Sequence, residues 1–488
     1  MTRPLVLIHG YSADWKAFEP LGDALIKRGI VPTDVNICNY VSLNNEITIK
    51  DIAEGLERAF RSHPILKDDN QPFDAIVHST GMLVLRSWLT NAGLRPDENH
   101  RLKRLKHLVG VAPATWGSPQ AHKGRTWLGA LVKGDRKIGP DFLNAGNKVL
   151  EGLELGSAFT WDLAHRDLLG PAPYYDTTPN TPYVAVFIGN TPYDGLSSVA
   201  NDPGTDGTVR WAGAGLNTRK ITIDLTRKLS DAAGNKTDRV TISPWASQRL
   251  DVPIIAVDGR NHCSILSDPD SEMVEYIVDF LTIGDKGGKD FDTWLAGARQ
   301  YGEKGKNKML LNPGAGAVDI VGEAKALLDH FIGREVGTEM DGWQQFVVHA
   351  RDERNDGVSD YMIEVLRNEG GSWQPFTEMY VDVHPYGPDP SYRCFQIRLP
   401  RGILAGVNPL QVRIHASTGT ELMAYQGYGD TVQQLTADSA PVELNLGALN
   451  KSLFQPFTTT LIEIILNREP LPFNKVSRIL QIVGTEGN

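Results

Sequence analysis

Apolar and polar positions follow two different patterns along the 488 residues of the chain. Up to about residue 285, short apolar runs alternate with segments in which apolar residues recur every three or four positions. The short runs are typical of interior parallel strands, and the longer segments are typical of amphipathic helices. From about residue 342 the period changes to two, with Gly, Pro, Asp and Asn between the runs. The sequence therefore predicts an α/β unit followed by a β-rich unit.

The predicted elements of the first unit alternate along the chain. We expect strands at 4–8, 35–41, 75–77, 105–112, 183–189, 219–225 and 252–257. We expect helices at 19–28, 47–62, 82–89 and 271–281. Strands that alternate with helices imply a mostly parallel sheet with helices on both faces. This is the α/β fold class.

The alternation stops between residues 113 and 176. This stretch contains helix-like segments such as TWLGALVKG, together with Trp116, Trp127 and Trp161. Two interpretations stay open. The stretch forms a helical cap or lid over a pocket, or it only adds a further layer to the sheet.

The best domain boundary is the charged, Gly-containing break DKGGK at 285–289. We therefore predict an α/β domain at 1–285 and a helical linker region at 286–340, with helices near 291–301 and 318–331. A β-rich domain follows at 341–488. Its short alternating strands are typical of a β-sandwich.

Composition and charge exclude several classes of protein. The content of 41% hydrophobic and 22% charged residues is ordinary for a globular protein. A net charge of −10 argues against a nucleic-acid partner. The N-terminal segment lacks the features of a secretory signal, and no apolar stretch approaches the roughly 18 residues that span a membrane. We expect a protein of the cytoplasm or one bound peripherally to a membrane.

Neither a metal nor a cofactor is expected from local motifs. Cys38, Cys263 and Cys394 lie far apart and form no CxxC pair, so neither a zinc site nor a disulfide framework is indicated. No phosphate-binding Gly loop is present. Only the Asp-containing loop at 202–206 leaves a structural calcium open.

Ser79 lies at the join of a predicted strand and a predicted helix. The segment FDAIVHSTGMLVLRSWL, residues 73–89, changes there from a buried-strand pattern to a helical one. A tight turn at this point exposes its middle side chain above the edge of the sheet, beside the amides of the helix start. We therefore expect Ser79 to be a catalytic nucleophile.

A serine nucleophile needs a base and a carboxylate that orients the base. In this architecture they should follow on later loops, in the order Ser, acid, His. His262 follows the strand VPIIAV on a loop before a helix, and is the predicted base. Asp206, in NDPGTDGTV, is the predicted acid, and Asp202 and Asp194 are its nearby rivals.

The first strand is followed by His9, Gly10 and Tyr11. Hydrolases of this architecture place one oxyanion donor in such an early loop and the other directly after the nucleophile. The backbone N–H groups of Tyr11 and Thr80 are therefore the predicted oxyanion hole. The supporting residues of the site are His9, Gly10, His78 and Gly81.

One position departs from the G-x-S-x-G pattern of the nucleophile turn. Val77 stands where the first Gly belongs. A β-branched side chain there would crowd the close packing of strand and helix. The alternative that Ser79 is only structural therefore stays open on this motif alone.

These motifs resemble those of α/β-hydrolases of the lipase/esterase kind. More narrowly, HSTG at Ser79, DGTV at Asp206, NHCS at His262 and the β-rich C-terminal part resemble the PlaB-type bacterial phospholipase A/lysophospholipase A family. That family departs from G-x-S-x-G at the same position. The resemblance at motif level covers residues 5–15, 76–82, 204–212 and 258–264. It implies Ser79, Asp206 and His262 as the triad.

The resemblance also implies a function. It implies hydrolysis of acyl esters in glycerophospholipids and lysophospholipids, peripheral membrane association and homo-oligomerisation, partly through the C-terminal domain. A neutral-lipid lipase or carboxylesterase with the same triad is the nearest alternative. A non-catalytic lipid-binding or scaffold protein is an alternative of another class. The apolar segment 458–473 is either a membrane or oligomer contact or the inward face of a strand.

Overall fold

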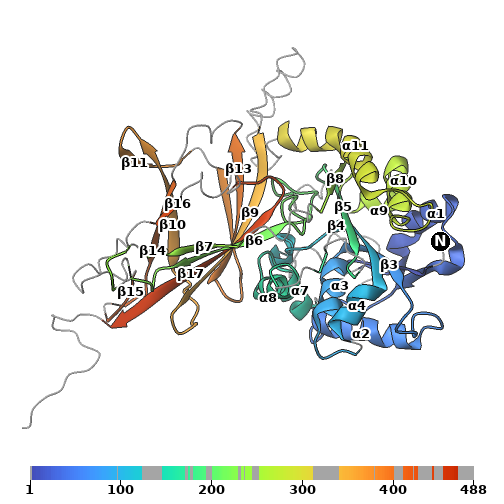
Figure 1. Ribbon diagram of the computed structural model, residues 1–488, viewed down its shortest axis with the longest axis horizontal. Helices are drawn as coiled ribbons and strands as arrows, with labels where there is room; N and C mark the ends of the chain where they lie inside the picture. The colour runs from blue at the N-terminus through green and yellow to red at the C-terminus, as the bar shows by residue number, and fades with distance from the viewer. Residues whose placement is uncertain are drawn as a thin grey trace, which may run out of the picture.

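The structure is a computed structural model, and it describes most of the chain. The described residues are 3–11, 13–95, 97–123, 146–170, 174–175, 180–193, 201–228, 232–235, 237–243, 252–311, 340–377, 380–400, 410–420, 422–426, 442–444 and 454–470. Within them the elements form an α/β group and a β group that lie side by side (Figure 1). Residues 124–145 of the predicted cap and the predicted helix at 318–331 lie outside the described residues.

The α/β group is built on a six-stranded sheet in which every neighbouring pair is parallel. The strands in spatial order are β2 (Val35–Cys38), β1 (Leu5–Ile8), β3 (Phe73–Ser79), β4 (Leu105–Pro113), β5 (Tyr183–Gly189) and β8 (Ile254–Val257). All residues of β1 and β3 are buried. This burial on both faces is what continuous apolar runs predict, and the α/β class is confirmed.

Helices cover both faces of this sheet (Figure 1). One face carries a core with residues of α1 (Glu19–Lys27), α9 (Ser264–Ser267), α10 (Ser271–Phe280) and α11 (Phe291–Leu311). The other carries a core with residues of α2 (Ile49–Ser62), α3 (Gly81–Thr90), α4 (Glu98–Arg104), α7 (Asn147–Leu153) and α8 (Ala158–Asp167). Short helices are η1 (Trp15–Phe18), η2 (Pro32–Asp34) and α5 (Gln120–Lys123).

Local sequence explains where the longer helices begin. Thr48 caps α2 by accepting the amide of Asp51, whose carboxylate in turn accepts the amide of Thr48. This capping box satisfies two amides that the first turn leaves without partners. Asp270 caps α10 in a similar way through the amide of Met273. No described helix is long and apolar enough to cross a bilayer.

The β group contains two sheets. The seven-stranded sheet has the order β12 (Tyr380–Pro385), β13 (Tyr392–Pro400), β9 (Met340–Asp352), β17 (Thr459–Pro470), β6 (Thr218–Asp224) and β7 (Val240–Ile242), and β15 (Met423–Gln426) pairs with β17. The four-stranded antiparallel sheet has the order β11 (Ser372–Pro375), β10 (Tyr361–Glu369), β14 (Leu410–Ala416) and β16 (Val442–Leu444). One apolar core contains residues of both sheets, so the sandwich-like prediction is confirmed.

The strand predicted at 219–225 has a different place from the one expected. It forms, as β6, but pairs with β17 and β7 in the seven-stranded sheet and not with the parallel sheet. Its sequence, TRKITID, explains the difference. Ile221 and Ile223 alternate with polar residues and contribute to the sandwich core, whereas a strand buried on both faces needs a continuous apolar run.

One face of the seven-stranded sheet packs against the α/β group, and the other face packs against the four-stranded sheet. On β9, Val347 belongs to a core of the α/β group, whereas Val348 belongs to the core between the two sheets of the β group. On β17, Leu461 and Ile464 are fully buried. Of the two interpretations of segment 458–473, β17 therefore corresponds to the inward-facing strand.

Candidate active site

Ser79 occupies a sharp turn between strand and helix. β3 ends at Ser79 and α3 begins at Gly81. The φ angle of Ser79 is 52°, in the left-handed region that residues other than Gly rarely adopt. Strained backbone of this kind is concentrated at functional sites, where it aims one side chain. The turn expected from the sequence is present.

Two glycines allow this turn to lie against the loop after β1. A Cβ on Gly10 would lie 2.8 Å from Cβ and 3.3 Å from Oγ of Ser79. A Cβ on Gly81 would overlap the carbonyl oxygen of Ile8. Val77, the departure from the sequence motif, is fully buried in the core and pairs in register with Ile8. The close approach therefore falls on the other side of Ser79, where glycine is present.

Two hydrogen bonds join Asp206 to His262, and two others orient the carboxylate of Asp206. Oδ2 of Asp206 lies 2.9 Å from Nδ1 of His262, and the amide of His262 donates to the carbonyl oxygen of Asp206 at 2.9 Å. Oδ1 accepts the amides of Thr208 and Val209 at 3.0 and 2.8 Å. Asp206 is fully buried. A carboxylate that accepts from Nδ1–H leaves Nε2 of the imidazole as the basic atom.

His78 links the nucleophile turn to the His262 loop. Its Nε2 lies 3.0 Å from the carbonyl oxygen of His262, and the two ring centroids are 4.7 Å apart. The pKa of His78 is held well below its usual value, mainly by burial and to a smaller extent by the nearby His262. His78 is therefore neutral, with the proton on Nε2, and it donates to His262. This contact places His262 beside the residue that precedes Ser79.

No hydrogen bond joins Ser79 Oγ to His262 within the described residues. Catalytic hydrogen bonds are often long before substrate binds and shorten in the complex. The structure brings Ser79, Asp206 and His262 to the same edge of the sheet. Their catalytic roles stay a prediction.

Contacts between His9 and Tyr40 hold the loop after β1 in place. Nδ1 of His9 donates to the carbonyl oxygen of Gly10 at 2.8 Å, and Nε2 accepts the amide of Tyr40 at 3.3 Å. The His9 and Tyr40 rings stack at 4.1 Å, and Tyr40 Oη donates to the His9 carbonyl at 2.7 Å. Burial lowers the pKa of His9. This loop carries Tyr11, and Thr80 is the N-cap residue of α3, directly after Ser79. The role of their N–H groups as oxyanion donors stays a prediction.

The sequence analysis missed Tyr40, although a signal was present. Tyr40 lies near the end of the strand predicted at 35–41 and just after β2, which pairs with β1 in parallel. Residues just after neighbouring parallel strands meet at the same edge of a sheet. A search of all strand ends would have placed Tyr40 next to His9.

The loop that carries Asp206 is also held by the seven-stranded sheet. Arg210 forms an ion pair with Asp382 of β12, and Nε2 of Gln396 on β13 donates to the carbonyl oxygen of Pro203 at 3.2 Å. Trp211 lies against Trp343 of β9, with ring centroids 5.8 Å apart. The sequence analysis missed these residues because no local pattern connects them.

The rivals of Asp206 have different places. The carboxylate of Asp202 accepts a hydrogen bond from Gln120 at 3.2 Å, and Asp194 lies outside the described residues. Among the three, Asp206 is the one with a hydrogen bond to His262 in the part of the chain that is described.

Comparison with known proteins gives a likeness over nearly the whole length of the chain. No family model matches the sequence, and no curated protein matches it. Among solved structures, phospholipase PlaB from Legionella pneumophila matches with a TM-score of 0.71 and 19% identity, over 99% of this chain and 98% of that chain. The same phospholipase in complex with thio-NAD matches with a TM-score of 0.68 at 19% identity over the same shares. The chain therefore has the PlaB-type α/β-hydrolase fold over nearly its whole length.

Proposed function

We propose that this protein is a serine hydrolase that cleaves acyl esters of glycerophospholipids and lysophospholipids. The observation that carries the proposal is the arrangement at one sheet edge. Ser79 has a left-handed backbone at a strand–helix turn, and a buried carboxylate orients the imidazole of His262 on the neighbouring loop. This combination is what an activated serine nucleophile requires.

The proposed reaction has two steps. Ser79 Oγ attacks the ester carbonyl while Nε2 of His262 takes its proton, and the alcohol part of the lipid leaves with that proton. Water then attacks the acyl-enzyme with His262 again as the base, and releases the fatty acid and Ser79. Asp206 stabilises the imidazolium in both steps.

The proposed oxyanion donors are the backbone N–H groups of Tyr11 and Thr80. Two amides directed at the developing oxyanion stabilise it in the transition state, and one such donor contributes about 3–4 kcal/mol. Gly10 supports this assignment, because it lets the Tyr11 loop approach Ser79 closely.

The choice of lipid esters rests on the likeness to phospholipase PlaB over 99% of this chain. Fold alone does not determine a substrate, so this part of the proposal is separate from the triad. Peripheral membrane binding and homo-oligomerisation belong to the same part. A neutral-lipid lipase or carboxylesterase would use the same triad, and a non-catalytic lipid-binding or scaffold protein would not need it.

The test is product release from a substrate panel. The panel is phosphatidylcholine, phosphatidylglycerol, lysophosphatidylcholine, triolein and a short-chain p-nitrophenyl ester. Wild type, Ser79→Ala and the exposed control Ser267→Ala are compared. We expect fatty acid from the phospholipids with wild type and Ser267→Ala, and a loss of roughly 10⁴-fold or more with Ser79→Ala.

Other outcomes separate the alternatives. Turnover of triolein or the short ester alone keeps the triad and overturns the phospholipid assignment. Activity that survives in Ser79→Ala overturns the nucleophile. An absence of turnover, together with no covalent labelling of wild type by a fluorophosphonate, favours the non-catalytic alternative.

A further inference from the structure

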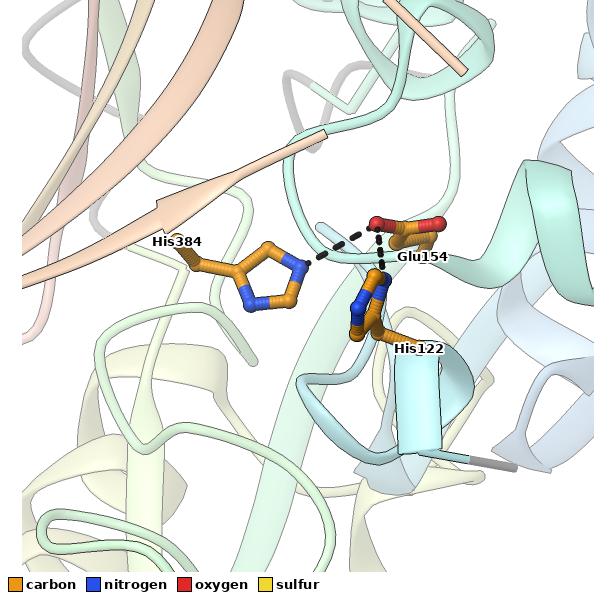
Figure 2. A group of neighbouring side chains, drawn as sticks. All are labelled: His122, Glu154 and His384. Atoms are coloured by element: carbon orange, nitrogen blue, oxygen red, sulfur yellow. Dashed lines mark hydrogen bonds and ion pairs between the residues drawn. The ribbon is translucent and has the colours of Figure 1, made fainter. Parts of the chain in front are cut away.

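Three potential metal ligands meet where the two groups of elements touch. His122 lies on α5, Glu154 directly follows α7, and His384 lies on β12 of the seven-stranded sheet. Figure 2 shows the two imidazole rings directed at the same carboxylate from opposite groups of elements. In sequence, His122 lies 32 residues before Glu154, and His384 lies 230 residues after it. The local spacing on which the sequence analysis relied could not have shown this cluster.

The distances within the cluster suit a small metal ion. Nδ1 of His122 and Nε2 of His384 lie 3.1 and 3.3 Å from Oε1 of Glu154. One ligand atom from each residue lies within 4.8 Å of the other two. Zinc binds His nitrogen and carboxylate oxygen at about 2.0–2.2 Å, so ligand atoms around a tetrahedral ion are roughly 3.2–3.6 Å apart. The separation of 3.3 Å lies within this range, that of 3.1 Å lies just below it, and the two imidazole nitrogens lie within 4.8 Å of each other.

The surroundings of Glu154 resemble those of a metal-binding carboxylate. Its side chain is 6% exposed, and the amide of Gly387 donates to Oε1 at 2.8 Å. A Cβ on Gly387 would lie 3.3 Å from both Oε1 of Glu154 and Nδ1 of His122, so the loop after β12 covers the cluster closely. Hydrogen bonds of this kind orient carboxylates that ligate metals.

The side chain of His122 is 58% exposed, whereas that of His384 is 15% exposed. An ion could therefore enter from the His122 side. Three protein ligands with one side open to solvent give four-coordinate zinc a place for water. A single carboxylate with two imidazoles does not suit calcium or magnesium, which prefer oxygen ligands.

We propose that His122, Glu154 and His384 form a binding site for a divalent transition-metal ion, with Zn²⁺ as the preferred ion. The ion would join the α/β group to the edge strand of the seven-stranded sheet. The same strand carries Asp382, which pairs with Arg210 on the loop that follows Asp206. Ser118, close to α5, donates to the carbonyl oxygen of Thr208 on that loop at 2.6 Å. A metal ion bound here would therefore stabilise the loop that carries Asp206 (the acid loop) through residues that lie outside the candidate active site.

The experiment measures zinc binding by the full-length protein. Metal is removed with a chelator, the chelator is removed by dialysis, and Zn²⁺ is titrated in competition with a chromophoric chelator. The variants are Glu154→Gln, His384→Ala and His122→Ala. The matched control is His415→Ala, because Nε2 of His415 lies 3.8 Å from a carboxylate oxygen of Glu364 with no second imidazole in that pair.

We expect one Zn²⁺ per chain in wild type and in His415→Ala. Loss of one ligand should weaken binding by roughly 100-fold or more, because even a lost supporting contact weakens metal binding 10–100-fold. Zn²⁺ should also raise the Tm of wild type and of the control, but not that of His384→Ala. Co²⁺, used as a spectroscopic probe, should show the spectrum of a four-coordinate site in wild type alone among wild type and the three ligand variants.

Two outcomes would overturn the proposal. One is folded wild type that binds no stoichiometric Zn²⁺, which would identify the cluster as a hydrogen-bonded clasp between the two groups of elements. The other is equal affinity in all variants. If Glu154→Gln fails to fold, His122→Ala decides the question, because His122 is exposed and its loss disturbs little packing. None of these readouts depends on ester hydrolysis.

Discussion

The two large sheets obtain their strands in opposite ways. In the six-stranded sheet, β1 with β2, β3 with β4 and β4 with β5 are pairs of strands consecutive in sequence, and β1 and β3 are buried over their whole length. The seven-stranded sheet collects strands from both halves of the chain and packs against a different core on each face. Local sequence therefore predicts which strands form the six-stranded sheet, but it does not predict which strands form the seven-stranded sheet.

This difference extends to the candidate site. Ser79 is the last residue of β3, His262 follows β8, and the local strand–turn–helix pattern predicts both. Asp206 lies on a long loop that β9, β12 and β13 hold in place. The proposed triad therefore depends on both sheets, and each can be tested separately.

The largest expected effect is on the acid loop. Asp206→Asn should lower kcat by about 10⁴-fold with the fold retained, because the imidazole loses the carboxylate that selects its tautomer. Asp202→Asn is the matched control, since Asp202 bonds to Gln120. Kinetics with a p-nitrophenyl ester measure both. Equal losses in the two variants would contradict the assignment of Asp206.

The next effect concerns the α/β group alone. Arg86 of α3 and Asp167 of α8 are both fully buried and form two hydrogen bonds, at 2.7 and 3.0 Å. Asp167→Ala should reduce the free energy of unfolding by about 3–5 kcal/mol, because it leaves the guanidinium buried without its partner. Glu275→Ala breaks the exposed pair with Arg28 and should cost less than about 1 kcal/mol. Denaturant unfolding of both variants checks this, and similar losses would contradict it.

The third prediction concerns the seven-stranded sheet and pH. Burial lowers the pKa of His349 on β9 from 6.5 to about 4. Between these two pH values, His349 binds a proton in the unfolded chain but not in the folded chain. The free energy of unfolding is therefore highest above pH 6.5 and decreases as the pH drops toward 4. His349→Phe keeps the ring that stacks on Tyr392 at 3.9 Å and removes the proton site.

We therefore expect the Tm of His349→Phe to fall less than that of wild type between pH 7 and pH 5. Thermal unfolding in matched buffers measures this difference. Identical pH dependence in the two proteins would show that His349 does not contribute to acid sensitivity.

The smallest effect compares two helical glycines. A Cβ on Gly22 of α1 would meet nothing within 4 Å, so Gly22→Ala should raise the free energy of unfolding by about 0.5–1 kcal/mol. Gly81→Ala should instead reduce both stability and activity, since its Cβ would overlap the Ile8 carbonyl beside the nucleophile turn. A stabilising Gly81→Ala would contradict the packing argument for the site.

How much the sequence predicted depends on the range of each interaction. The parallel sheet, the sandwich-like second part and the turn at Ser79 follow from local periodicity and are confirmed. The strand β6 was expected in the wrong sheet, because its partner β17 lies near the other end of the chain. Arg210 with Asp382, and Glu154 with its two imidazoles, are long-range pairs of the same kind. Their residues have no period or spacing in common, so only the folded chain shows them.

The position of β17 has a consequence for the order of events during synthesis. β17 pairs with β9 on one side and with β6 on the other, and β6 directly follows the loop of Asp206. On a ribosome, β6 is made long before the strand that fills the gap beside it. Until then one edge of β6, the strand after the Asp206 loop, has no partner strand, and such an edge can pair with other chains. Arrival of the last strand would therefore close the sheet and complete the support of the site in one late step, so that an unfinished chain carries all three proposed catalytic residues without their final support.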